Sequence, residues 1–227
     1  MLVVKEVTKS FDDLPVLNNI GFQIADNEIV ALIGPSGCGK STLLNIISGL
    51  EPLDIGKIEY SGDAISYVFQ DDRLLQWRSV WDNIRIVNNT INENEISELI
   101  CDVGLKGFEK YKPNQLSGGM KKRCGIARAF YYKSKLLIMD EPFQGLDYCL
   151  RQEMLKMLLR VWNRRKQSVL FITHEIDEAL TVAGRIVVMS KRPGTILQEF
   201  NLKGIEDRSL SSLEINNIRQ QIVSSLT

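Results

Sequence analysis

Short apolar runs alternate with amphipathic stretches over most of the chain. Within the predicted strand Glu28–Ile33, the run Ile29–Ile33 is apolar at consecutive positions, as expected of a parallel strand that is buried on both faces. Similar runs return at Lys135–Asp140, Ser168–Thr173 and Arg185–Ser190. Helical spacing of apolar residues predicts helices between them, at Arg151–Arg165 and Ile176–Ala183. This alternation predicts an α/β fold with a parallel sheet at its core.

The remaining segments predict two additions to that core. The β-rich early segments Leu2–Val7 and Gly21–Ile24 predict an antiparallel β flank. The turn residues that separate the early strands are Asp12-Asp13, Asn18-Asn19 and Asp26-Asn27. Two further strands are predicted at Lys57–Tyr60 and Ile65–Phe69. Helical spacing over residues 79–132 predicts an inserted helical subdomain. We therefore expect one domain over residues 1–227, with a weak helix in the polar tail at 205–227.

Composition and charge narrow the class of protein. The 28 basic residues balance 28 acidic ones, which gives no reason to expect nucleic acid as a partner. None of the four cysteines forms a CxxC pair or lies near a histidine, so we expect reduced thiols in a cytosolic protein. No run of about 18 apolar residues is present. A role at a membrane would therefore require docking to an integral membrane protein.

A glycine-rich loop follows the first buried strand. The segment Gly34–Thr42 matches the pattern GxxxxGK[ST], in which backbone N–H groups surround phosphate oxygens. The helix that opens at Lys40 directs its positive end at the same oxygens, and Lys40 adds a point charge. The Ser41 hydroxyl is a suitable ligand for Mg²⁺, which prefers oxygen. The sequence thus predicts a site for Mg-ATP. Its residues are Gly34, Pro35, Ser36, Gly37, Cys38, Gly39, Lys40, Ser41 and Thr42.

Two acids end the apolar strand at Leu136–Asp140. Asp140 is a candidate ligand of Mg²⁺, and Glu141 is placed to polarise an attacking water. Acidic residues end many strands, so this pattern gains its meaning only together with the phosphate loop.

His174 follows another predicted strand, Ser168–Thr173, and is the sole histidine of the chain. An isolated histidine at such a position is usually a capping residue. Because ligands bind at the carboxyl ends of the strands in α/β sheets, contact with the γ-phosphate is the better interpretation here.

A second candidate anion site lies at Leu116–Met120, just before a basic helix. Its exposed N–H groups and helix dipole favour a phosphate group. The alternative is an ordinary helix capped by Ser117. One chain does not obviously bring this turn onto its own phosphate loop, whereas a second copy does.

Together these motifs resemble the ATP-binding-cassette (ABC) ATPase family over nearly the whole chain. Gly34–Thr42 resembles its Walker A loop, Leu136–Asp140 its Walker B strand, and Leu116–Met120 its signature, commonly LSGGQ, with Met120 in place of the last glutamine. Gln70, Glu141, Gly145–Asp147 and His174 stand at the Q-loop, the catalytic acid, the D-loop and the switch histidine. Phe11 stands where the family has an aromatic residue that stacks on adenine. The resemblance implies a P-loop NTPase fold.

The resemblance also implies roles and an assembly. Two copies would form a head-to-tail dimer that holds ATP between one phosphate loop and the other signature. The implied catalytic residues are Glu141, His174, Gln70 and Lys40. The implied trans contacts are Ser117, Gly118, Gly119, Met120 and Asp147. The implied ligands of Mg²⁺ are Ser41, Gln70 and Asp140.

A narrower resemblance links Asp72–Ile84 to importer ATPases for nitrate, sulfonate, taurine and thiamine-precursor pyrimidines, which usually carry proline where Gln76 stands. LSGGM and Ser190–Gly194 are also typical of them. By analogy, the segment after Gln70 receives a permease helix, and exposed Trp77 and Trp81 would suit such an interface. Packing of both tryptophans in the helical core is an equal alternative.

These features predict an ATPase subunit of an importer, peripheral at the cytoplasmic face of the membrane, with a permease and an external solute-binding protein as partners. An exporter, lipoprotein-release or cell-division complex is the alternative. A soluble ATPase acting on DNA or ribosomes is less consistent with the length and neutral charge of the chain. Gln144, Gly125 and Met120 depart from the usual family pattern without removing a catalytic group.

Overall fold

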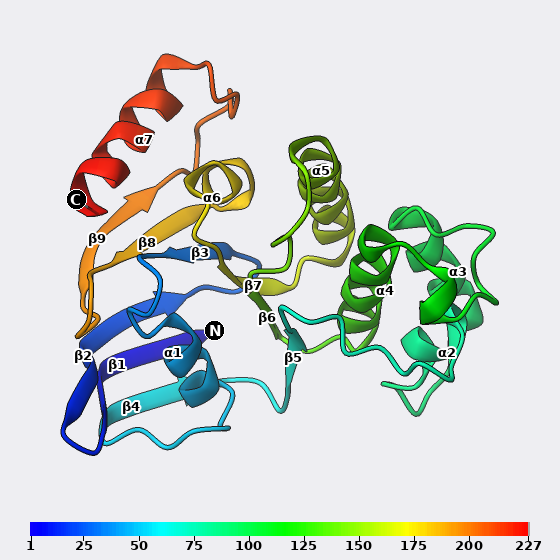
Figure 1. The fold of residues 1–227 in the computed structure, drawn as a ribbon, viewed down its shortest axis with the longest axis horizontal. Coiled ribbons are helices and arrows are strands. Elements are labelled where there is room, and N and C mark those ends of the chain that lie inside the picture. The colour runs from blue at the N-terminus through cyan, green and yellow to red at the C-terminus, as the bar shows by residue number, and fades with distance from the viewer. Residues whose placement is uncertain (227) are drawn as a thin grey trace.

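Two β-sheets and the helices around them make up the computed structural model, which describes residues 1–226 (Figure 1). The larger sheet has the strand order β5-β6-β7-β3-β8-β9, and the smaller sheet has the order β2-β1-β4. The strands of the larger sheet are β3 (Ile29–Ile33), β5 (Ile65–Val68), β6 (Leu136–Asp140), β7 (Ser168–Ile172), β8 (Arg185–Met189) and β9 (Ile196–Asn201). Those of the smaller sheet are β1 (Leu2–Phe11), β2 (Leu14–Ile24) and β4 (Ile55–Tyr60).

The predicted parallel core is confirmed. Strand β3 pairs in parallel with both β7 and β8, and β6 pairs in parallel with β5 and β7. Every residue of β3 and β7 is buried, which explains their continuous apolar sequence. The edge strand β9 runs antiparallel to β8 and was not predicted. Only Phe200 of its residues is buried, so β9 carries almost no apolar pattern.

Alternate residues of the parallel strands enter two different cores. Val30 and Leu32 of β3 pack with α1 (Lys40–Ile47) and the smaller sheet. Ala31 and Ile33 belong to the core that includes α5 (Tyr148–Arg165) and α6 (Ile176–Val182). Both faces of the larger sheet are therefore covered by apolar side chains. Polar functional residues can lie only at the ends of its strands.

The antiparallel flank is confirmed, with one correction. Strand β2 runs without a break from Leu14 to Ile24, so the predicted turn at Asn18-Asn19 is wrong. Asn19 instead has φ of 51° within the strand, where the pairing with β1 shifts between Val7 and Lys9. An irregular pair accommodates such turn-forming residues, because the local distortion gives asparagine the left-handed conformation that it tolerates.

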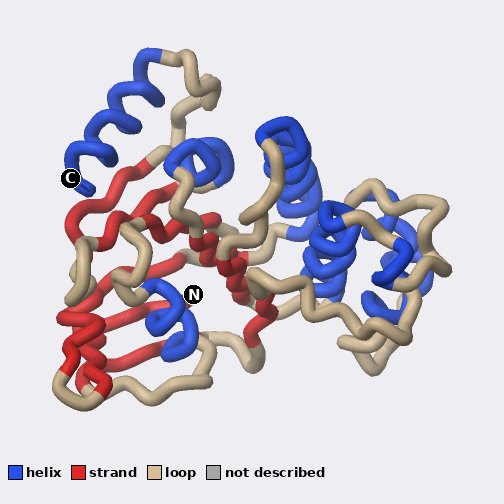
Figure 2. The backbone as a smooth tube through the Cα atoms, in the orientation of Figure 1, coloured by secondary structure: helices blue, strands red, loops and turns tan. Residues whose placement is uncertain are grey.

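The region predicted as helical contains three α-helices, which lie apart from α1 in the same view (Figures 1 and 2). They are α2 (Val80–Arg85), α3 (Glu93–Asp102) and α4 (Gly118–Tyr131), with a 3₁₀ turn at Pro113–Gln115. Their apolar faces join the core that also includes α5. None of the helices among residues 1–226 combines the length and apolarity that a membrane span requires.

The tail ends in α7 (Leu213–Leu226), as predicted, and packs on α6, β8 and β9. Thr227 of the predicted tail lies outside the described residues. Arg208 precedes α7 and donates to the carbonyl oxygens of Leu180, Ala183 and Leu202 at 2.9 to 3.2 Å. The guanidinium therefore connects the tail to the end of α6 and to the end of β9.

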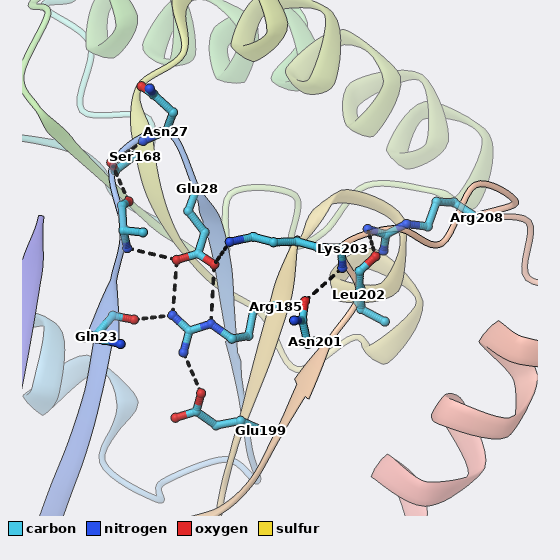
Figure 3. A network of polar contacts seen from close by, with 11 residues as sticks. Gln23, Asn27, Glu28, Ser168, Arg185, Glu199, Asn201, Leu202, Lys203 and Arg208 are labelled. Atoms are coloured by element: carbon cyan, nitrogen blue, oxygen red, sulfur yellow. Dashed lines mark hydrogen bonds and ion pairs between the residues drawn. The ribbon is translucent and has the colours of Figure 1, made fainter.

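An ion-pair network around the buried carboxylate of Glu28 joins the amino end of β3 to β8 and to the end of β9 (Figure 3). The carboxylate of Glu28 lies 3.2 Å from Arg185 Nη2 and 2.9 Å from Lys203 Nζ, and Arg185 also pairs with Glu199. Burial alone would raise the pKa of Glu28, but the hydrogen bonds from Arg185, the Ala25 amide and Lys203 outweigh it and lower that pKa. The network secures the sheet at the end opposite the phosphate loop.

Candidate nucleotide-binding site

The phosphate loop connects the carboxyl end of β3 to the start of α1, as predicted. Gly37 and Gly39 have φ of 74° and 106°, conformations that favour glycine. Gly39 caps α1 and no side chain binds the N–H groups of its first turn. Those groups and the helix dipole can therefore receive an anion. The Lys40 side chain lies within the loop, with Nζ 2.7 Å from the Gly34 carbonyl oxygen and 2.9 Å from that of Pro35.

A loop after β8 supports the phosphate loop from behind, a contact that we did not foresee. Arg192 Nε donates to the Gly37 carbonyl oxygen at 3.1 Å. A Cβ atom at Gly194 would lie 2.4 Å from the Cys38 carbonyl oxygen, so only glycine fits there. Ser190–Gly194 stood out in the sequence as a family-like segment, but nothing in the pattern said which loop it would contact. Cys38 is buried beneath this contact.

Asp140 and Glu141 lie at the carboxyl end of β6. Asp140 Oδ2 accepts a hydrogen bond from the Tyr67 hydroxyl at 3.4 Å. Burial raises the pKa of Asp140, and the neighbouring charge of Glu141 raises it further. Glu141 has φ of 43°, and its N–H donates to the Ile172 carbonyl oxygen of the adjacent strand at 3.0 Å. This backbone turn directs the carboxylate sideways, toward the end of β7.

His174 meets Glu141 at that point. Its Nδ1 lies 3.2 Å from Glu141 Oε2, and its side chain is 43% exposed. The structure thus brings together two residues that are 33 positions apart in sequence. The capping alternative for His174 is not what the structure shows, because Thr173, not His174, accepts the hydrogen bond from the Glu175 amide.

Gln70 does not contact Asp140 in this structure. Its Nε2 donates to the Gln144 side chain, and its carbonyl oxygen accepts a hydrogen bond from Lys122 at 3.3 Å. Placement of Gln70 on a metal ion stays a prediction that requires its side chain to turn. Phe11 ends β1 with 43% of its surface exposed, and Lys9 Nζ lies 5.0 Å from its ring centroid. An exposed aromatic ring at this position fits the predicted adenine contact.

The Leu116–Met120 turn begins α4, with Ser117 as the N-cap, which accepts a hydrogen bond from the Met120 amide at 3.3 Å. Ser117 and Gly118 are exposed, whereas Gly119 packs against Leu150. Helix α4 stands apart from α1 (Figure 1), so the chain does not fold this turn onto its own phosphate loop. Asp147 caps α5 through the Leu150 amide at 3.0 Å and is exposed as well. The trans roles of these residues stay predictions.

Comparison with known proteins decides the family. A model of the ABC transporter family matches residues 17–144, more than half of the chain. An aliphatic sulfonates import ATP-binding protein, SsuB of Bacillus cereus, is 38% identical, with 97% of this chain and 93% of the relative covered. The chain belongs to the ABC transporter family. A second SsuB protein, from Pseudomonas aeruginosa, is 35% identical and covers 100% of this chain and 96% of the relative.

Solved structures of ABC cassettes have the same fold. The dimeric bacterial cassette MJ0796 has a TM-score of 0.76 at 27% identity, covering 90% of this chain and 100% of that one. A cassette from Clostridium perfringens, cbiO1 of the transporter complex cbiONQ, has a TM-score of 0.81 at 25% identity, covering 98% and 96%. MJ0796 is also known in a post-hydrolysis state with ADP and Pi, with a TM-score of 0.75. The predicted P-loop NTPase fold and ATPase activity of this ABC protein are confirmed.

The residues present fit a magnesium ion held with ATP. Residues 1–226 contain no cluster of three or more His, Cys, Asp or Glu side chains suited to a metal ion. A cation here would therefore rely on hard oxygen ligands: the hydroxyl of Ser41, the carboxylate of Asp140 and the phosphates of the nucleotide. Burial and the neighbouring charge of Glu141 disfavour the ionised form of Asp140, and a cation at this place would stabilise that form.

Proposed function

We propose that this ABC ATPase is the energy-supplying subunit of an importer for a small organic anion, with an aliphatic sulfonate as the leading candidate. The support is the name shared by several relatives, which are aliphatic-sulfonate import proteins and are 35 to 42% identical. That name favours import over the export and cell-division alternatives. The solute itself would be bound by a permease and an external binding protein, not by this chain.

The observation that carries the catalytic part is the Glu141–His174 pair at the ends of β6 and β7. A carboxylate 3.2 Å from the imidazole is held in one place, where it can accept a hydrogen bond from the attacking water. His174 then contacts the γ-phosphate and senses its presence. Lys40 neutralises charge on the terminal phosphates. When bound, Mg²⁺ would neutralise further phosphate charge from the side of Ser41 and Asp140.

Two copies of the chain would complete the site. Ser117 and Gly118 are exposed at the start of α4 and would contact the nucleotide of the other subunit, together with the backbone of the buried Gly119. Asp147 would reach across the same interface. Met120, half-buried, replaces the polar glutamine of the usual motif. We infer a head-to-tail homodimer, in which ATP closes the interface and hydrolysis reopens it.

The permease would dock beside Trp77. Asn83, fully buried, fixes the loop before α2: its Oδ1 accepts from the Leu75 amide at 2.8 Å, and its Nδ2 donates to the Ser79 carbonyl oxygen at 2.9 Å. That loop presents Trp77 with 69% of its surface exposed, whereas Trp81 packs against the core. Of the two alternatives from the sequence, exposure at an interface therefore fits Trp77, and packing in the helical core fits Trp81. Docking here would place the subunit at the cytoplasmic face of the membrane.

The substitution Glu141→Gln tests the proposal. We expect ATP hydrolysis to fall by about 100-fold or more, because the amide cannot accept a proton from water. ATP should then stabilise a dimer that size-exclusion chromatography with light scattering detects. Glu153→Gln, an exposed change on α5, is the matched control and should retain activity. Hydrolysis at the wild-type rate in Glu141→Gln would contradict the proposed role. Co-purification of the chain with a permease tests the importer assignment separately.

A further inference from the structure

The side chain of Arg151 lies between two loops of the nucleotide site. It belongs to the first turn of α5, directly after the loop Gly145–Asp147. Its Nη2 donates to the Leu146 carbonyl oxygen at 3.2 Å. On its other side, Nη1 forms an ion pair with Glu175 Oε1 at 2.8 Å. The buried Nε makes no hydrogen bond, but it lies 3.4 Å from Glu178 Oε1, close enough for an ion pair. One guanidinium therefore connects the loop before α5 to the loop and helix after β7.

Glu178 extends this connection to the residue before His174. Its side chain is 5% exposed, and the Thr173 hydroxyl donates to its Oε2 at 2.7 Å. The same hydroxyl accepts a hydrogen bond from the Glu175 amide at 3.0 Å. Burial raises the pKa of Glu178, and the Thr173 hydrogen bond and the charge of Arg151 oppose that rise. The two sequence neighbours of His174 are therefore both linked to Arg151: Thr173 through Glu178, and Glu175 directly.

The imidazole of His174 lies between two carboxylates, one near each of its ring nitrogens. Glu141 Oε2 is 3.2 Å from Nδ1, and Glu175 Oε1 is 4.0 Å from Nε2. The same oxygen, Glu175 Oε1, is the one that pairs with Arg151 Nη1. A cavity of about 80 Å³ lies among these groups, and its lining includes Glu141, Arg151, His174, Glu175 and Glu178. Release of Glu175 would leave it space to move toward the imidazole.

We propose that Arg151 is a positioning residue, which keeps His174 against Glu141 by holding the Leu146 carbonyl and the carboxylates of Glu175 and Glu178 in one arrangement. A guanidinium suits this task because its positive charge can pair with both carboxylates while one of its N–H groups donates to the Leu146 carbonyl oxygen. The inference deepens the proposed function and rests on it. Arg151 also connects two loops of the site. Its bond to the Leu146 carbonyl oxygen holds the loop that carries Asp147, which is predicted to reach the other subunit. Its ion pair with Glu175 holds the loop that carries His174.

A structural role alone would also make Arg151 important, so the test separates stability from positioning. Arg151→Met removes the guanidinium and leaves the buried Glu178 carboxylate without its cation, which should lower the unfolding midpoint. The double variant Arg151→Met/Glu178→Gln removes that uncompensated charge. Its amide oxygen can still accept the Thr173 hydrogen bond, so the midpoint should return toward that of the wild type. The link to Leu146 and Glu175 stays broken.

In the double variant we expect kcat for ATP hydrolysis to stay about 10- to 100-fold below wild type, since displacement of a catalytic group by about 1 Å has effects of that size. KM for ATP should change little, because none of the Arg151 contacts described above involves the phosphate loop. Arg160→Met is the matched control: Arg160 lies on the same helix and bonds the Asp102 carbonyl oxygen at 3.2 Å. It should retain wild-type kcat.

The NMR signal of the imidazole reports on position directly, since His174 is the sole histidine of the chain. At fixed pH and without nucleotide, the signal should shift or broaden in the double variant and stay unchanged in Arg160→Met. The inference is overturned if kcat recovers together with stability, or if kcat stays low while the His174 signal keeps its wild-type position. Glu141→Gln in the same assay tests the proposed function. If that variant remains active, the proposed function is wrong. If Glu141→Gln is inactive and the double variant is fully active, only the inference about Arg151 is rejected.

Discussion

The ammonium of Lys40 lies 2.7 Å from the carbonyl oxygen of Gly34, which joins the two ends of the phosphate loop. Lys40 is only 6% exposed, and the same ammonium also reaches the Pro35 carbonyl oxygen. The phosphate loop thus provides two carbonyl acceptors for its own buried cation. A bound phosphate would offer Lys40 a charged acceptor in their place, which makes binding a rearrangement of hydrogen bonds around a charge that is already in position.

Lys40→Ala should weaken ATP binding by about 10- to 100-fold, because hydrogen bonds between charged groups contribute about 1.5–3 kcal/mol. Calorimetric titration with Mg-ATP measures the affinity. Lys57→Ala, at an exposed lysine paired with Glu59, is the control and should bind as the wild type does. Equal affinity in the two variants would contradict the role of Lys40.

His174→Ala should retain ATP binding and lose most hydrolysis. We expect a fall in kcat of about 100-fold, since the histidine orients groups at the γ-phosphate and its loss also leaves Glu141 without its partner. Steady-state kinetics separates kcat from KM. A rise in KM with an unchanged kcat would show that His174 contributes only to binding.

Glu28→Gln should destabilise the fold by about 3 kcal/mol near neutral pH, because it leaves Arg185 and Lys203 without the shared carboxylate. The pKa of Glu28 is lowered in the folded state from an ordinary value of 4.5. Its contribution is therefore fully present above that pH, and it is lost as the pH falls through 4.5 toward the folded-state pKa.

Urea unfolding at several pH values checks this expectation. The stability difference between wild type and Glu28→Gln should shrink as the pH falls below about 4.5, where the wild-type carboxylate begins to lose its advantage. A difference that stays constant down to about pH 3 would show that the ionised form of Glu28 is not what stabilises the sheet.

Gly125→Ala should stabilise the protein by up to about 1 kcal/mol, because alanine is the better helix former and Gly125 lies inside α4. A Cβ atom there would meet its nearest neighbour, the Asp72 carbonyl oxygen, at 3.8 Å, which is an ordinary contact. Thermal unfolding should shift upward by about 2–4 °C. Gly194→Ala is the contrasting change: its Cβ would lie 2.4 Å from the Cys38 carbonyl oxygen, and both stability and ATP affinity should fall.

Trp77→Ala should weaken association with the permease, since large aromatic side chains at the centre of an interface carry much of its binding energy. Co-purification from membranes that contain the tagged permease measures the effect. Leu213→Ala, at a residue 77% exposed on α7, is the control for a change at an exposed apolar position. Equal loss of association in both variants would place the docking surface elsewhere.

The sequence by itself determined the parallel core and most of the nucleotide site. Buried parallel strands such as β3 are apolar at every position, and the phosphate loop is contiguous in the chain, so both are visible without a fold. Antiparallel strands were found less completely. The edge strand β9 buries a single residue, and Asn18-Asn19 of β2 carry a turn signal that pairing with β1 overrides.

The tertiary structure alone decided which distant residues meet. Three features depend on strand order and on how loops pack: the contact of Arg192 and Gly194 with the phosphate loop, the exposure of Trp77 against the partial burial of Trp81, and the place of Arg151 beside the His174 loop. A local pattern reports which side of an element is apolar. It does not predict which loops contact each other, because those contacts depend on how the two cores pack on the two faces of the sheet.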